Sequence, residues 1–498
     1  GHAAAANITT GYRSVIIGKS AGDAITTTPG VVLIGYNAGG AINHDDAAYT
    51  VAIGQSAGAA ITSGRYQTLV GYRAGVSITE GDSNTFIGYN SGDALTTGLE
   101  NTALGYSSLG ANITGQRSVA IGNNALGTNL ASGWTYNTAV GWGAGSNNTV
   151  GSSGTFIGSR AGYNATGSYN TFVGTSAGEG GTTSAPFSSG TSNVALGYQA
   201  LTAFTTGGNN VAIGKGSSPA LTTGIGNVSI GVSANESSTT GNYNVAIGYN
   251  SHQYISGGDK NIAIGYAALQ SSGTAANNDA QYNIGIGYWA LLAITDGDNN
   301  TVLGNLAASA MTTTSDTVII GVEAGDAINS TDANGSVLIG RSAGGAITSG
   351  IGNVAIGYQA LDAEDDGDYN TAIGYQALTA QTGASGEVGN TALGYQAGKA
   401  VTSGIRNTII GYKAAHVMTT PTDMTVIGEE ALPTQTGGTA GRGTHIGARA
   451  GFRQNLASGV DSNISIGYTA NFSNITGGAN ISIGYAAGYG VANHSPGN

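Results

Sequence analysis

A cluster of carboxylates lies in the segment ALDAEDDGDYN, and carboxylate oxygens are ligands that calcium prefers. The acidic residues are Asp362, Glu364, Asp365, Asp366 and Asp368. Their spacing matches neither the EF-hand loop nor the glycine- and aspartate-rich repeat of calcium-binding β-rolls. The cluster therefore has two interpretations, a calcium site and a solvated acidic turn. We favour the turn, and we expect the protein to need no cofactor.

The other segments that resemble chemical motifs belong to a repeat. RSVIIGKSAG (13–22) ends like a phosphate-binding loop, but Arg13 stands where that motif requires its first glycine. The six histidines are scattered along the chain and form no ligand pair. We predict that the protein is not an enzyme. A polysaccharide lyase on the same fold would need basic and acidic residues clustered across adjacent coils, and the sequence shows no such cluster.

Composition and charge exclude further classes. Only 8% of the residues are charged and the net charge is −12, so we expect no binding to nucleic acid, which depends on lysine and arginine. No apolar run reaches the length of about 20 residues that a membrane-spanning helix needs, so we expect no membrane insertion. Because 40% of the residues are hydrophobic, the chain has enough apolar surface to form a core.

One phrase repeats through the whole chain and decides the architecture. N-[TV]-A-I-G-Y-type segments centred on a glycine occur 27 times, from Gly18 to Gly484, and 17 of the 26 spacings are 17 residues. A fixed short period of this kind is the signature of a solenoid. We predict an all-β protein, a parallel β-solenoid (β-roll) of about 27 coils with a repeat of about 17 residues. Residues 1–498 are expected to form a single continuous repeat domain.

The positions around the repeated glycine predict the structure of one coil, and we number them from that glycine. Position −3 is always Val, Thr or Ile and position −1 is always Ile, Leu or Val, which is the period-two pattern of a strand. We expect two short strands and two turns per coil, with −3 and −1 inside. Asn occupies −4 in 17 copies, and we expect these side chains to hydrogen-bond from coil to coil.

Position −2 should then face away from the interior, because successive strand residues point to opposite faces. It nevertheless carries a large apolar residue in 11 copies. These residues are Ile16, Leu33, Leu69, Phe86, Phe156, Phe172, Val302, Ile319, Leu338, Ile409 and Val426. An apolar face of this length exceeds what a soluble monomer normally exposes, so we predict inter-chain packing through these residues in a homotrimer. The alternative is that they pack within their own coil.

Tyrosine frequently follows the repeated glycine and gives a candidate receptor-binding surface. The candidates are Tyr36, Tyr72, Tyr89, Tyr106, Tyr358, Tyr375 and Tyr395. Exposed aromatic side chains bind sugars, whereas the alternative is that these rings pack against each other or against a neighbouring chain.

The segments NTAIGYQA (370–377) and NVAIGYNS (244–251) resemble the head repeat of YadA-like trimeric autotransporter adhesins and the NTAIGYQAL repeats of phage tail fibres. The resemblance covers essentially the whole chain. It implies a trimer of parallel β-rolls that serves attachment outside the cell, on a virion or a cell surface. The 17-residue repeat with tyrosine after glycine is closer to the fibre version, because adhesin-head repeats are usually shorter.

We therefore predict a non-enzymatic tail-fibre-like protein that provides structural reach and attaches to a host cell-surface glycan or protein. A bacterial surface adhesin or filament subunit of the trimeric autotransporter type is the alternative. Ice binding is less favoured, because the threonines of runs such as Thr96-Thr97 are adjacent and point in different directions.

Overall fold

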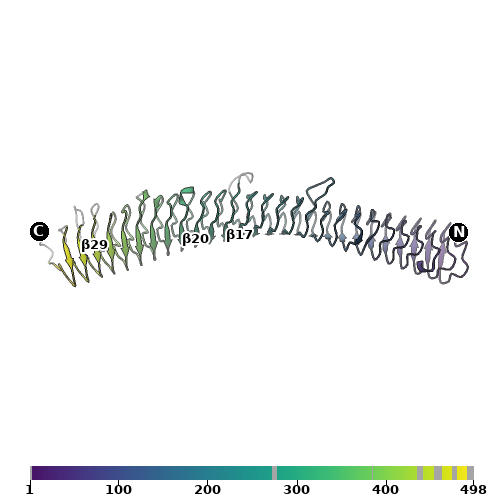
Figure 1. Cartoon of the computed structure of the whole chain (residues 1–498), viewed down its shortest axis with the longest axis horizontal. Helices are drawn as coiled ribbons and strands as arrows, with labels where there is room; N and C mark the ends of the chain where they lie inside the picture. Colours follow the sequence, from purple (N-terminus) through teal and green to yellow (C-terminus); the bar gives the residue numbers. More distant parts are fainter. Residues whose placement is uncertain are drawn as a thin grey trace. The chain divides into compact units, whose positions relative to one another are not determined.

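The computed structural model describes residues 3–271, 278–383, 385–433, 441–453, 462–473 and 479–490. The protein is an all-β parallel β-solenoid with a repeat of about 17 residues, as the sequence predicts (Figure 1). The coils group into two compact units, residues 1–246 and 247–498. The described residues contain no helix with the length and apolar character to cross a membrane.

Each copy of the repeated phrase forms one three-residue strand at positions −3 to −1. The first unit holds β1 (Val15–Ile17), β2 (Val32–Ile34), β3 (Val51–Ile53), β4 (Thr68–Val70), β5 (Thr85–Ile87), β6 (Thr102–Leu104), β8 (Val119–Ile121), β10 (Thr138–Val140), β11 (Thr155–Ile157), β12 (Thr171–Val173), β13 (Val194–Leu196), β14 (Val211–Ile213) and β15 (Val228–Ile230). Strand β16 (Val245–Ile247) carries the same motif at the boundary between the units.

The second unit repeats this arrangement. It holds β17 (Ile262–Ile264), β18 (Ile284–Ile286), β19 (Thr301–Leu303), β20 (Val318–Ile320), β21 (Val337–Ile339), β22 (Val354–Ile356), β24 (Thr371–Ile373), β26 (Thr391–Leu393), β27 (Thr408–Ile410), β28 (Thr425–Ile427), β29 (Thr444–Ile446), β30 (Ile464–Ile466) and β31 (Ile481–Ile483). The described helices are two short 3₁₀ turns, Asp45–Ala47 and Thr331–Ala333.

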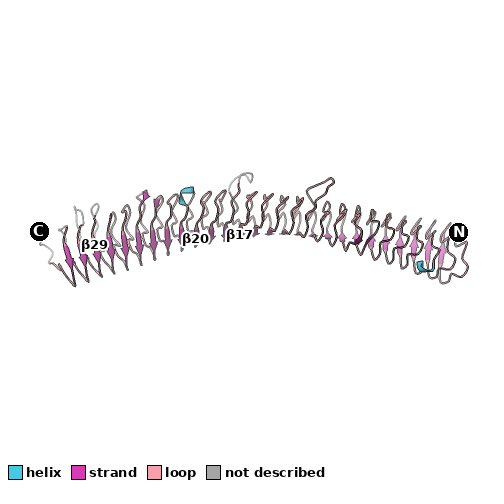
Figure 2. Ribbon diagram, viewed as in Figure 1, coloured by secondary structure: helices cyan, strands magenta, loops and turns pink. Residues whose placement is uncertain are grey.

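Neighbouring strands pair in parallel and in exact repeat register within each unit, and Figure 2 shows them along one side of the coils. Thr85 pairs with Thr102 and Phe86 with Ala103, so equivalent positions of successive coils lie directly above one another. A side chain that recurs at one position therefore becomes a continuous row.

The repeated glycine is required by both backbone conformation and space. Gly71 has φ +136°, a region that residues with a side chain rarely adopt. A Cβ atom at Gly71 would collide with the carbonyl oxygen of Gly88, the equivalent glycine in the next coil. Glycine therefore allows the strand to turn at this point while the backbones of the two coils are in direct contact.

The second strand predicted for each coil is absent from most of the described coils. Short second strands occur as two parallel pairs, β7 (Gly115–Gln116) with β9 (Gly133–Trp134) and β23 (Gly367–Asp368) with β25 (Gly386–Glu387). Left-handed residues at +2 and +4, such as Asn90 (φ 53°) and Leu109 (φ 54°), interrupt an extended run elsewhere. The turns still bond from coil to coil, as where Gly92 N donates to Ser108 O (2.9 Å).

Position −2 points into the interior of its own coil, and −3 and −1 point outward. The sequence-based assignment was the reverse and is wrong. Of the residues assigned to inter-chain packing, Leu33, Leu69, Phe86, Phe156, Phe172, Val302, Ile319, Leu338, Ile409 and Val426 are buried within the single chain, and Ile16 is half-buried and packs against the core. The rows at +3, +4 and +7 complete the interior, so −2 needs no second chain to cover it.

In several coils the sizes of the residues at −2 and +4 compensate for each other. Gly92 at +4 has no side chain, and a Cβ there would clash with the ring of Phe86 at −2 of the same coil. In the next coil Ala103 stands at −2 and Leu109 at +4, and both are buried. Leucine at +4 also follows alanine at −2 in the pairs Ala120/Leu126, Ala195/Leu201, Ala355/Leu361 and Ala372/Leu378. In these coils the same interior volume is filled either from −2 or from +4.

The asparagines at −4 form the predicted coil-to-coil hydrogen bonds. The side-chain oxygen of Asn210 accepts from the backbone N–H of Asn227 (2.9 Å), and its Nδ2 donates to the carbonyl oxygen of Gly224 (2.8 Å). Both asparagines are buried. The row therefore satisfies buried backbone groups that the short strands leave unpaired.

Candidate functional site

The outward face of the strands is an apolar surface. The rows at −3 and −1 consist of β-branched and aliphatic side chains that are half-buried or exposed, because each is shielded only by its neighbours in the row. Ile87, Leu104 and Ile157 at −1 expose 37%, 44% and 40% of their surface. Repetition in successive coils makes this the candidate contact surface of the fold.

The tyrosines at +1 flank this surface as a second row. All seven sequence candidates are exposed. Within a run the rings stack on one another, with centroids 4.8 Å apart for Tyr72 and Tyr89 and 5.4 Å apart for Tyr89 and Tyr106. The same stacking joins Tyr358, Tyr375 and Tyr395. Tyr36 instead lies near the Lys19 ammonium group. The alternative in which the rings pack against each other is therefore observed for six of the seven candidates.

Stacking limits the chemistry of the tyrosine row. Rings in the middle of a run, such as Tyr89 and Tyr375, have neighbouring rings on both faces, so their edges and hydroxyl groups are what meet the solvent. A sugar cannot stack flat on such a ring, but a row of hydroxyls can donate and accept hydrogen bonds. The row therefore suits polar contacts beside the apolar face.

Sequence reasoning missed a further row of aromatic and charged side chains at −5. Tyr49 and Tyr66 stack there with centroids 5.9 Å apart. Arg117 lies over the ring of Tyr136 in the next coil and donates to Glu100 (2.7 Å) in the preceding one. Tyrosine recurs at −5 in the sequence and was the available signal. The exposed Arg117–Glu100 ion pair contributes little to stability, because solvent screens it.

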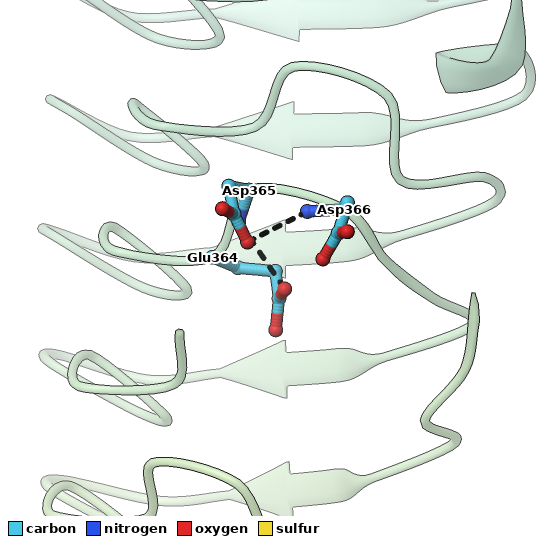
Figure 3. Close-up of side chains that lie close together, drawn as sticks. All are labelled: Glu364, Asp365 and Asp366. Atoms are coloured by element: carbon cyan, nitrogen blue, oxygen red, sulfur yellow. Dashed lines mark hydrogen bonds between the residues drawn. The ribbon is translucent and has the colours of Figure 1, made fainter. Parts of the chain in front are cut away.

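Three of the five acidic candidates are close together. Carboxylate oxygens of Glu364, Asp365 and Asp366 lie within 4.8 Å of one another (Figure 3). Asp362 lies outside this group, and Asp368 accepts a hydrogen bond from the backbone N–H of Ile351 (2.8 Å).

Glu364 is fully buried, at position +7, where other coils place an apolar residue such as Ile347. Its Oε1 accepts from the backbone N–H groups of Gly367 (2.8 Å) and Asp365 (3.2 Å). Asn112 at +7 of another coil makes the same bond to Gly115 (2.6 Å), so this is a turn motif of the fold. Glu364 Oε2 has no hydrogen-bond partner.

The cluster is arranged as a self-bonded turn. In Figure 3 the second Glu364 oxygen points away from Asp365 and Asp366, so the unpaired atom does not complete a ligand set with them. Burial raises the pKa of Glu364, although the two N–H groups oppose the shift. Burial and the neighbouring Asp365 raise the pKa of Asp366. Both shifts favour neutral carboxyl groups.

No protein-family model matches the chain, and a search of curated proteins finds no match either.

Proposed function

We propose that this protein is a non-enzymatic fibre segment, located outside the cell as part of a virion, that provides reach and attaches to a host surface. The observation that carries the proposal is the repetition of two outward rows, the aliphatic strand face and the tyrosine row, in successive coils. Such a surface offers many identical weak contacts, and their number raises the overall avidity of a fibre as its length increases.

We propose that the aliphatic face packs against identical chains in a homotrimer. The first unit contributes 13 strands to its ladder. With about 4.8 Å per rung and about 10 Å per three-residue strand, that ladder covers about 600 Å² before the tyrosine row is added. A stable interface buries about 800 Å² per partner, so one unit approaches the required area. A second copy of the chain also has the same spacing between strands, so its side-chain rows match those of the first copy.

The assembly is tested by charge placed on the two faces of the strand. Asp at Ile87 and Ile157 faces outward and should give a folded monomer, because like carboxylates would meet at the symmetry axis. Asp at Phe86 and Phe156 faces the core and should abolish folding. Light scattering gives the mass and circular dichroism the fold. A native chain that is monomeric at micromolar concentration contradicts the assembly.

Attachment is tested with fluorescently labelled protein on a panel of bacterial strains and on epithelial cells. A tail fibre should bind particular bacterial strains, whereas the alternative, an adhesin of the trimeric autotransporter type, should bind the epithelial cells. Replacing Tyr89 and Tyr106 by Phe removes two exposed hydroxyls and should weaken binding if the tyrosine row makes the contact. Protein that binds neither kind of cell contradicts attachment.

A further inference from the structure

The longest insertion in the repeat builds a pocket on the turn side of the coils. Gly174 and Gly197 are 23 residues apart, and the extra residues form the projecting loop between the purple coils and the β17 label in Figure 1. Backbone bonds fix the base of this loop, from Gly181 N to Phe204 O (2.8 Å) and from Ser189 N to Thr205 O (2.7 Å). Inside it, the Thr182 and Ser188 hydroxyl oxygens lie 2.9 Å apart.

The loop and the turns of neighbouring coils line an open depression of about 420 Å³. The loop contributes Pro186 and Phe187 to the lining, and the turns contribute Thr149, Val150 and Thr206. This volume lies in the range of about 300–1,000 Å³ typical of small-molecule sites. Ser188 N also donates to Asn164 O (3.0 Å) in the preceding coil, so the base of the loop is bonded to coils on both sides and the pocket exists before a ligand arrives.

Val150 distinguishes this turn from its equivalents. It stands at +9 and exposes 70% of its surface, whereas the same position carries Thr206 and Thr223 in other coils. An exposed aliphatic side chain that lines a pocket beside Phe187 provides an apolar contact surface. The threonine hydroxyls around it provide polar contacts.

The lining residues also define the charge of the ligand. They are threonine, serine, alanine, valine, proline and phenylalanine, and none of them is charged. A charged ligand would lose its hydration without gaining an ionic partner. A ring with an apolar face and several hydroxyls would place its C–H groups against Val150 and Phe187, and its hydroxyls against Thr149 and Thr206.

We propose that this pocket binds an uncharged pyranose ring of a surface glycan. The inference rests on the proposed attachment function and assigns it a receptor chemistry. Attachment then involves a discrete site at the insertion in addition to the repeated rows.

The test uses the intact protein with methyl glucoside, methyl galactoside and N-acetylglucosamine as neutral probes, and glucuronic and sialic acids as charged ones. Saturation-transfer NMR and calorimetry should show millimolar binding of at least one neutral sugar and weaker binding of both acids. Val150→Lys should weaken that binding by about tenfold or more, which corresponds to about 1.4 kcal/mol. Thr223→Lys, at the equivalent position of a coil without the insertion, should leave it unchanged. Both sites are exposed, and circular dichroism verifies the fold.

Three results overturn the inference: no neutral sugar binds, an acidic sugar binds more tightly, or Val150→Lys binds as the native protein does. The cell-binding assay separates this inference from the proposed function. Cells that bind the native protein and Val150→Lys equally leave attachment standing and remove the pocket from it. Sugar binding that depends on Val150, without any cell binding, supports the pocket and contradicts attachment.

Discussion

Exchange of side-chain volume between −2 and +4 predicts a strong coupling between two positions of one coil. Phe86 and Gly92 fill the same space that Ala103 and Leu109 fill in the next coil. The double variant Phe86→Ala/Gly92→Leu should therefore convert one natural form of the coil into the other. Each single change should destabilise the coil, because Phe86→Ala leaves a cavity and Gly92→Leu overfills the interior.

The structure sets the expected magnitudes. Phe86→Ala alone should cost about 3–5 kcal/mol, the usual range for deleting a buried aromatic side chain. Gly92→Leu alone should cost about 1–3 kcal/mol or more, because its Cβ would already clash with the Phe86 ring. The double variant retains only the cost of a left-handed leucine, about 1–2 kcal/mol, which Leu109 bears at φ 54°. The coupling energy should be about 3 kcal/mol or larger.

Amide hydrogen exchange is the suitable assay, since it reports the opening free energy of individual coils in a repeat protein. The backbone amides of Thr85 and Thr102 donate between neighbouring coils and report this region. Protection should fall in both single variants and return in the double variant. If the two losses simply add, the volume exchange is not what holds these coils together.

Further predictions concern the backbone, the acidic turn and the asparagine row. Gly71→Ala should cost about 3 kcal/mol or more in thermal unfolding, whereas Gly133→Ala, with φ +72° but open space around it, should cost about 1–2 kcal/mol; equal losses would contradict the close contact between coils. The raised pKa of Glu364 means that its contribution to stability is complete below the unfolded value of about 4.3 and is lost as pH rises through the folded pKa, so Glu364→Gln should be more stable than the native protein at pH 7 but not at pH 4. Added calcium should leave the melting temperatures of the native protein and of Glu364→Gln unchanged. A calcium-dependent rise in the native protein alone would instead support a calcium site at the acidic turn. Asn210→Leu should cost about 1–3 kcal/mol, measured by urea unfolding, because it leaves the buried Gly224 carbonyl and Asn227 amide without partners.

Periodicity alone determined the repeat, the parallel register and the asparagine row. A residue that recurs every 17 positions has to stack on its equivalents if the coils stack, so Thr85 over Thr102 followed from counting. The all-β class followed equally from three-residue β-branched segments bounded by glycine. The sequence also identified the acidic cluster, although only the structure showed which three of its members are close together.

Only the tertiary structure decided which face of each strand points into the interior. The period-two alternation of a strand places −2 on the face opposite −1 and −3. It does not indicate which of the two faces points into the interior. Only closure of the coil decides, because the interior has to fit −2 together with the rows at +3, +4 and +7. The exchange of Phe86/Gly92 for Ala103/Leu109 was visible in the sequence and pointed to a shared interior volume, since residues on opposite faces have no reason to compensate in size. The pocket under the inserted loop depended on the fold for the same reason: Val150 and Phe187 are far apart in sequence, and only the stacking of coils places them in one cavity.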